Sequence, residues 1–450
     1  MKTEEITRQS AISQIKNLIE SHSEQEIQNL LDDLKPQDIA DVLESSPPAQ
    51  RTTLWELFDE SHQREIIQHI DEDVVLSLLS DKSGEQIATV LEQTDDDDTA
   101  DILQRLPADL IQEVLEAMDA QDRSRVENLL AYPEDTAGGM MDTDTISVRP
   151  QVSLDVVLRY LRRHAELPSM TDSIFVVNST DEFVGVLPLA TLLVSNPALT
   201  VGEMMVTKIE AIPADMSEHE VAAKFERYDL VSAPVIDQDN RLLGRITIDD
   251  VVDVIIDEAD HSILGMAGLN EDSDIFAPIV KTAKSRAIWL GANLITAFIA
   301  ASVIDIFKDT IEKVVALAVL MPIVASMGGV AGSQTLTLVI RNMAQDELFN
   351  NNLAWLTRRE VAVGAINGCL WAFVVAVATS ILFNDTRLGL IIAAALVINL
   401  LTAALSGALL PNFLRSIRID PAIAGTVVLT TITDVVGFLS FLGLATLFYA

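Results

Sequence analysis

This chain of 450 residues lacks several features that disulfide-linked secreted proteins and nucleotide hydrolases depend on. Its single cysteine, Cys369, lies in an apolar run, which excludes a disulfide framework and a cysteine-based metal site. The opening residues MKTEEITRQS are polar, which argues against a cleavable signal peptide. The phosphate-binding pattern G-x-x-x-x-G-K-[ST] is missing. We therefore expect a non-enzymatic protein whose first half stays in the cytoplasm.

Basic residues are scarce in the first part of the chain. Residues 1–283 hold 58 of the 67 acidic residues but only 20 of the 30 basic ones, so their net charge is −38 in a chain with a net charge of −37. A strongly acidic surface repels nucleic acid and anionic lipid and attracts divalent cations. We therefore expect divalent cations, and no nucleic acid, as partners. For any single acid, an ordinary solvated surface role is the alternative.

Glycine is almost missing from residues 1–132, where Gly84 is the one example. Apolar residues recur there at helical spacing, for example Ile12, Ile15 and Ile19. The sequence therefore predicts an all-helical domain.

A short internal repeat indicates how these helices are arranged. Residues 37–43, followed by Pro47, are echoed by residues 97–103, followed by Pro107. Such recurrence is typical of a superhelical stack. The acidic run 95–98 starts the second copy, and it either caps a helix or contributes to a divalent-ion site.

After Gly138 the pattern changes to short β-branched runs that alternate with helical stretches and turns. Two copies of a β-α-β-β-α unit align, with strands expected at 146–150, 173–177 and 184–186, and again at 209–213, 233–236 and 243–246. This arrangement resembles a tandem CBS pair, a module that dimerises and often binds adenine nucleotides. By this resemblance, Thr247 and Asp250 stand where nucleotide-binding copies hold a ribose, so ATP or another adenine nucleotide is a candidate ligand.

Residues 251–285 read as an amphipathic connector. Such a helix either transmits motion as a rigid lever or serves as a passive linker. His261 lies among carboxylates, and a lone histidine is more often a surface residue than a ligand or switch.

Five apolar segments follow, at about 287–306, 314–340, 361–383, 388–410 and 421–449. Each is long enough to cross a bilayer as a helix. Basic residues favour the side that carries the first half, as seen at Lys281, Lys284, Arg286, Arg341, Arg358, Arg359, Arg415 and Arg418. By the positive-inside rule, the N-terminal domains lie in the cytoplasm.

Asp434 is the one ionisable residue of the last apolar segment. A carboxylate at that depth costs roughly 2.5–3.5 kcal/mol, so it indicates a functional group facing water or a cation. Thr426, Thr430 and Gly437 share its helical face. Oxygen ligands on such a stripe suit Mg²⁺ or Ca²⁺. The alternative is a hydrogen bond that merely joins two helices.

The second apolar segment contains Pro322 and three glycines beside polar residues. We expect its Gly328, Gly329, Gly332, Ser333 and Gln334 to line a cavity, because backbone freed there offers carbonyls to an ion. Close helix packing is the alternative.

Four polar residues of other segments are expected to form hydrogen bonds between helices. These are Asn293, Thr296, Asn399 and Thr402.

Together these features resemble the MgtE family of magnesium transporters, over nearly the whole chain. The resemblance implies an acidic superhelical all-α domain (1–132), an α/β tandem CBS pair (133–255), a connector helix (256–283) and an all-α five-span transmembrane domain (284–450). It also implies a homodimer in the lipid of the cell inner membrane, with a Mg²⁺-selective channel between the second and fifth spans.

The resemblance assigns roles to single residues. Asp434 would hold a largely hydrated Mg²⁺, with Thr430 adding an oxygen nearby and Glu312 attracting cations at the external end. Regulatory Mg²⁺ would bind Asp98, Asp250, Asp253 and Glu258 and close the pathway.

The chain departs from the family pattern at two places. His261 and Ser262 stand where relatives often carry two acids, which puts the strength or pH dependence of gating in doubt. Val330 stands where relatives often carry asparagine, which bears on selectivity.

Two other functions fit the residues. One is a proton- or Na⁺-coupled divalent-cation exporter in which Asp434 changes its protonation. The other is a membrane-anchored sensor, which predicts no flux and indifference to the loss of Asp434.

Overall fold

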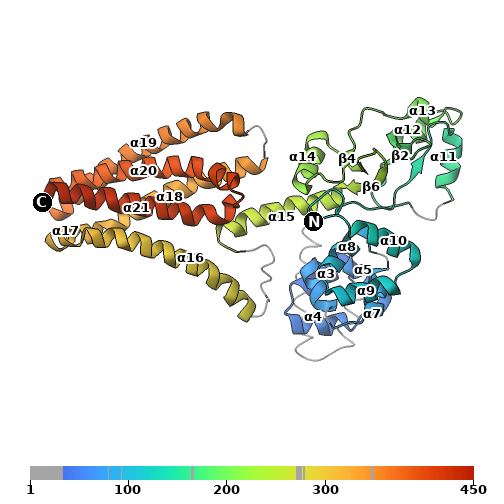
Figure 1. The fold of residues 1–450 in the computed structure, drawn as a ribbon, viewed down its shortest axis with the longest axis horizontal. Helices are drawn as coiled ribbons and strands as arrows, with labels where there is room; N and C mark the ends of the chain where they lie inside the picture. The colour runs from blue at the N-terminus through green and yellow to red at the C-terminus, as the bar shows by residue number, and fades with distance from the viewer. Residues whose placement is uncertain are drawn as a thin grey trace. The chain divides into compact units, whose positions relative to one another are not determined.

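The computed structural model describes residues 34–79, 81–92, 94–163, 167–269, 276, 279–345 and 349–449. The predicted helical positions Ile12, Ile15 and Ile19 lie outside these residues. The chain divides into two compact units, Met1–Ile256 and Asp257–Ala450, and each is described by itself (Figure 1).

Short helices build the first described part of the first unit, as the sequence predicts. They are α3 (Pro36–Glu44), α4 (Pro48–Trp55), α5 (Glu60–Ile67), α6 (Glu72–Leu79), α7 (Gly84–Leu91), α8 (Asp96–Gln104), α9 (Ala108–Ala117) and α10 (Ala120–Leu129). The sequence echo corresponds to α3 and α8, each of which is followed by a helix that begins at or just after a proline. Each helix packs on the one two places further along, α3 on α5, α5 on α7 and α7 on α9, and likewise α4 on α6, α6 on α8 and α8 on α10. This order is that of a superhelical stack.

Gly84 lies where α7 packs on α9. A Cβ atom there would lie 2.5 Å from the Cβ of Glu113. The backbone of α7 therefore approaches α9 more closely than a side chain would allow.

Two small mixed sheets follow in the same unit, which confirms the CBS pair. The first comprises β1 (Ser147–Val148), β2 (Ser173–Val177) and β3 (Phe183–Pro188), and the second β4 (Ile212–Pro213), β5 (Ser232–Ile236) and β6 (Leu242–Thr247). In both, the first two strands are parallel and the last two antiparallel, with a register shift at the end of the middle strand. The helices of this pair are α11 (Leu154–Leu161), α12 (Leu189–Val194), α13 (Val201–Met204) and α14 (Glu218–Tyr228).

The helix α15 (Ile248–Met266) follows β6 directly and runs from the first unit into the second. The second unit continues with α16 (Ile279–Ile306), α17 (Lys308–Lys313), α18 (Ala316–Gln345), α19 (Phe349–Phe383), α20 (Thr386–Ser416) and α21 (Pro421–Tyr449). Five of these, α16 and α18 to α21, are long and apolar enough to span a membrane. In Figure 1 they run alongside one another as a bundle.

The centre of the bundle is α20. Its most apolar stretch is 56% buried, against 6% for α16, and it packs on α18, α19 and α21. The apolar faces that remain exposed on α16 and α19 are those expected of helices in contact with lipid.

Of the four polar residues expected to join helices, one does so. The side-chain amide of Asn399 on α20 donates a hydrogen bond to the carbonyl of Val324 on α18, at 2.8 Å. Asn293, Thr296 and Thr402 instead donate to carbonyls three or four residues earlier in their own helices. The prediction was wrong for these three, because a short polar side chain on a helix reaches its own preceding turn first.

Candidate functional site

A groove of about 760 Å³ lies between α18 and α21 in the second unit. Its lining residues are Ala325, Ser326, Gly329, Val330, Ser333, Gln334, Thr337, Thr430 and Asp434. Among these, Asp434 is the ionisable side chain, and five others carry a hydroxyl or an amide. The groove therefore presents oxygen atoms and a single carboxylate in an otherwise apolar bundle.

The helix α18 runs unbroken through Pro322 and the three glycines. Its backbone is therefore not opened into a loop along the groove. Pro322 lies in the second turn of this helix, where it removes the N–H that would bond to the carbonyl four residues earlier.

The three predicted glycines separate into two kinds. A Cβ atom on Gly328 would lie 2.3 Å from the side-chain nitrogen of Asn399, and one on Gly332 would lie 3.0 Å from Leu429. These two glycines therefore face neighbouring helices and do not line the groove. Gly329 does line it, since a Cβ atom there would meet nothing closer than a methyl carbon of Thr430 at 4.0 Å.

Two threonines on the same face of α21 differ in whether they line the groove. Thr430 lines the groove, and its hydroxyl donates back to the carbonyls of Thr426 and Val427 at 3.0 Å each. Because the hydroxyl hydrogen is used in this way, the Thr430 oxygen is left to accept. Thr426, one turn earlier on α21, is not among the lining residues.

Glu312 lies far from Asp434. It is exposed on α17, whose Thr310 hydroxyl pairs with that of Thr446 on α21 at 2.8 Å. Thr446 is twelve residues beyond Asp434, or about 18 Å along a helix. Glu312 therefore belongs to the far end of α21 and not to the groove.

A second concentration of carboxylates lies in the first unit, around the start of α8. Asp97 is 5% exposed, and its Oδ1 atom has no hydrogen-bond partner. Burial raises the pKa of the Asp97 carboxyl well above its ordinary value, and the charges of Asp250, Asp98 and Asp142 raise it further. Asp98, which the sequence predicted, is itself exposed.

Asp250 lies at the first turn of α15, where it accepts hydrogen bonds from the backbone N–H and the hydroxyl of Thr247, at 3.1 and 2.9 Å. Burial raises the pKa of Asp250 to about 6, against the opposing effect of the Thr247 N–H. Burial also raises the pKa of Asp253, one turn later, and the charge of Asp249 adds to this. These carboxylates are held close enough to disfavour one another's ionised form.

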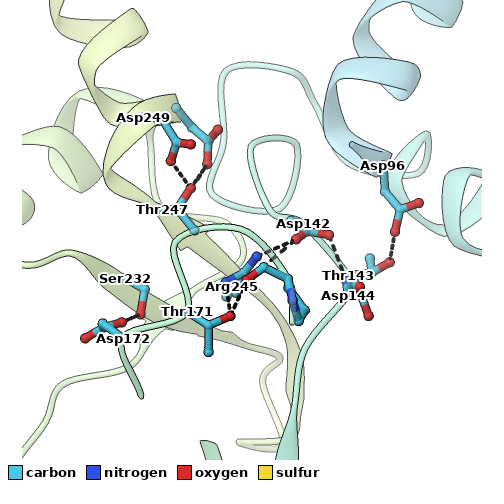
Figure 2. A network of polar contacts seen from close by, with 12 residues as sticks. Asp96, Asp142, Thr143, Asp144, Thr171, Asp172, Ser232, Arg245, Thr247 and Asp249 are labelled. Carbon is cyan, nitrogen blue, oxygen red and sulfur yellow. Dashed lines mark hydrogen bonds and ion pairs between the residues drawn. The ribbon is translucent and has the colours of Figure 1, made fainter. Parts of the chain in front are cut away.

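Sequence reasoning missed Asp142 and Arg245. Their side chains form a buried ion pair at 3.1 Å, and their backbones exchange two hydrogen bonds (Figure 2). Asp142 and Asp144 share an Asp-x-Asp spacing just before β1, which was the available signal. Thr143 between them donates a hydrogen bond to Asp96 on α8, which joins the CBS pair to the helical stack. We call Asp97, Asp98, Asp142, Asp250 and Asp253 the acidic cluster.

The residues that the structure describes contain no group of three or more His, Cys, Asp or Glu side chains already arranged to hold a metal ion. In the first unit, the charges of Asp98 and Asp250 both act on Asp97, and that of Asp249 acts on Asp253. Among the described residues, these acids form no closed coordination shell. Glu258, the fourth predicted regulatory acid, belongs to the second unit.

His261 has a specific partner within the second unit. Its Nε2 atom lies 2.6 Å from Oδ2 of Asp420, the residue before the first residue of α21. The sequence placed His261 on the surface. It is in fact part-buried and contacts the start of the helix that carries Asp434.

Comparison with known proteins shows the family to which these features belong. The MgtE model, described as a divalent cation transporter, matches residues 321–444, the model of the MgtE intracellular N domain matches 34–135, and the CBS domain model matches 137–195 and 201–257. The magnesium transporter MgtE of Thermus thermophilus is 32% identical over 339 residues, which cover 75% of each chain. The chain belongs to the MgtE family. The Bacillus subtilis magnesium transporter MgtE is 31% identical over 334 residues, or 74% of each chain.

Two solved structures resemble the first part of this MgtE family member. The cytosolic domain of the Mg²⁺ channel MgtE in complex with ATP is 29% identical, covers 54% of this chain and 99% of that chain, and has a TM-score of 0.49. The soluble part of a magnesium transporter is 22% identical, covers 56% and 99%, and has the same TM-score.

Family membership identifies the chain as a magnesium transporter and a multi-pass membrane protein, and its relatives are transporters, not enzymes.

Proposed function

We propose that this chain is a Mg²⁺-selective, channel-like uptake pathway in the cell inner membrane, with its N-terminal domains in the cytoplasm. The observation that carries the proposal is the position of Asp434, a carboxylate in a membrane-spanning helix that lines a groove among hydroxyl and amide groups. Such groups bond well to the water molecules that Mg²⁺ gives up reluctantly.

The membrane potential is sufficient to drive this movement. Inward transfer of a divalent ion gains about 4.6 kcal/mol per 100 mV, twice the value for one charge. No ATP hydrolysis is needed.

A second copy of the chain completes the pathway in this proposal. Val330 lines the groove yet is 57% exposed, and an exposed apolar rim beside a polar groove is typical of an interface. In the homodimer, the Asp434 carboxylates of both copies face one ion path.

The acidic cluster of the first unit supplies the gate. The charges of Asp98, Asp142 and Asp250 all act on the buried carboxyl of Asp97, and Asp253 lies one turn beyond Asp250 on α15. Cytoplasmic Mg²⁺ screens this repulsion and favours a compact, closed arrangement, in which Glu258 of the connector also takes part.

An adenine nucleotide at the CBS pair is a further part of the proposal, suggested by the relative solved with ATP. In this chain the Thr247 hydroxyl already bonds to Asp249 and Asp250. A ribose at this position must therefore replace those hydrogen bonds.

The decisive experiment is Mg²⁺ flux into proteoliposomes at a fixed membrane potential, with and without a pH gradient. Asp434→Ala and Asp434→Asn should reduce the flux to that of empty liposomes, because both remove the charge. Glu312→Gln is the control with a carboxylate far from the groove, and it should lower flux only at low ionic strength.

Retained flux in Asp434→Ala would overturn the proposed pathway. Flux that needs Asp434 but also vanishes without the pH gradient would favour the proton-coupled exporter.

A further inference from the structure

Asn399 is a fully buried polar residue at the point where α18, α20 and α21 meet. Its exposed fraction is 0%. Its side-chain nitrogen donates to the carbonyl of Val324, and its Oδ1 atom has no hydrogen-bond partner. A buried acceptor left unpaired is costly, so the residue is not explained as ordinary packing within the bundle.

Two glycines on the neighbouring helices make room for the Asn399 amide. A Cβ atom on Gly328 of α18 would lie 2.3 Å from its nitrogen, and one on Gly437 of α21 would lie 2.9 Å from the same atom. No methyl group fits at either place without movement. The amide thus acts as a spacer between the two helices that form the groove.

Both glycines lie next to groove residues. Gly328 precedes Gly329, which lines the groove, and Gly437 follows Asp434 by three residues, or about one helical turn. A shift of either helix at the spacer therefore changes the separation between Gly329 on one wall and Asp434 on the other.

We propose that Asn399 is a positioning residue that sets the width of the groove at Asp434 and thereby the discrimination among divalent cations. It acts through helix separation and through the Val324 hydrogen bond, without touching the ion. The reason is that a hydrated Mg²⁺ and the larger Ca²⁺ require different spacing of the same oxygen groups. This inference rests on the proposed role of Asp434 in the ion path.

The test compares Mg²⁺ and Ca²⁺ flux through the full-length chain in proteoliposomes at fixed potential. Asn399→Ala removes the spacer and should lower the Mg²⁺-to-Ca²⁺ flux ratio by about threefold or more, a size typical of coupling through packed side chains. Thr402→Val is the matched control on the same helix, since the Thr402 hydroxyl bonds only to Ile398 of its own helix. It should leave the ratio unchanged.

A second pair of variants tests the contact itself. Gly328→Ala should reduce flux of both ions, because its methyl group collides with the Asn399 amide. Adding Asn399→Ala should restore flux, because the collision is removed. Flux is expressed per amount of folded protein, so that a recovery of stability alone does not count as a recovery of flux.

The outcomes separate the two proposals. If flux persists in Asp434→Ala, the proposed function fails. If flux needs Asp434 but Asn399→Ala leaves the ratio unchanged, and Gly328→Ala is not rescued by the second substitution, the spacer role is overturned. Should Asn399→Ala fail to fold, the double variant and Asn399→Ser give the same decision, since either restores part of the missing volume or polarity.

Discussion

The three glycines of α18 differ in what lies beside them where a side chain would be. Gly328 and Gly332 bring α18 against Asn399 and Leu429, whereas Gly329 borders free space within the groove. Helical glycines in membranes are usually explained by packing. Of these three, only Gly329 borders open space, which is the property that the proposed ion path requires.

The substitution Gly329→Leu should therefore block Mg²⁺ flux while leaving the fold intact. A leucine side chain projects into the groove and meets no close neighbour on the way. Flux in proteoliposomes and the thermal unfolding midpoint in detergent should be measured together. Gly332→Leu is the informative comparison, because it should lower the unfolding midpoint through its collision with Leu429. Normal flux in Gly329→Leu would show that ions do not pass this point.

At the scale of the element, α15 makes different contacts near its two ends. Its first turn contributes Asp250 to the acidic cluster of the first unit. Further along, His261 contacts Asp420 at the start of α21 in the second unit. One continuous helix therefore carries both Asp250 of the acidic cluster and a contact to the helix of Asp434.

Replacing His261 by aspartate should make this contact depend on a divalent cation. Two carboxylates would then face each other at more than the present 2.6 Å, because aspartate is shorter than histidine, and they repel unless a cation bridges them. Hydrogen exchange of the α15 amides should accelerate in His261→Asp without Mg²⁺ and slow when Mg²⁺ is added, by a larger factor than in the unmodified chain. Ser262→Asp adds the same charge one residue away and serves as the control. Equal Mg²⁺ responses in both variants would argue against the His261 contact as a coupling point.

At the scale of the whole molecule, charge is distributed very unevenly. The residues before Lys284 carry nearly all of the negative charge, and the membrane-spanning helices carry almost none. Where the helical stack and the CBS pair meet, this charge is partly buried, which raises the pKa of Asp97 and Asp250. Ionisation of these groups therefore opposes the packing of the first unit.

The stability of the first unit should fall as pH rises through about 6, the pKa of Asp250 in the folded chain. A carboxyl whose folded pKa is raised stabilises the fold fully below its unfolded pKa and loses that contribution above the folded value. Between pH 5 and 7.5 without divalent ions, the unfolding midpoint of this unit should drop by about 5 °C. Scanning calorimetry of the full chain measures this change, and Mg²⁺ at the higher pH should reverse it.

The matched variant is Asp250→Asn, which removes the titration while keeping the shape of the side chain. Its unfolding midpoint should vary less with pH and respond less to Mg²⁺. A midpoint that rises with pH in the unmodified chain would contradict the assigned direction.

Much of the fold could be read from the sequence because it rests on local periodicity. The short helices of the stack, strand 173–177, strand 233–236 to within one residue of its observed start, and the five apolar spans follow from apolar spacing and turn residues alone. Asp434 was likewise evident, since a carboxylate within an apolar helix has few ordinary explanations.

The tertiary structure decided what periodicity cannot encode, namely which side of each residue faces which neighbour. Sequence alone treated Gly328, Gly329 and Gly332 as equivalent, yet only Gly329 lines the groove. It also could not single out Asn399 from the other polar residues of the spans, nor pair His261 with Asp420, which lies 159 residues away. These outcomes depend on helix rotation and on contacts distant in sequence, and both are fixed only when the helices pack together.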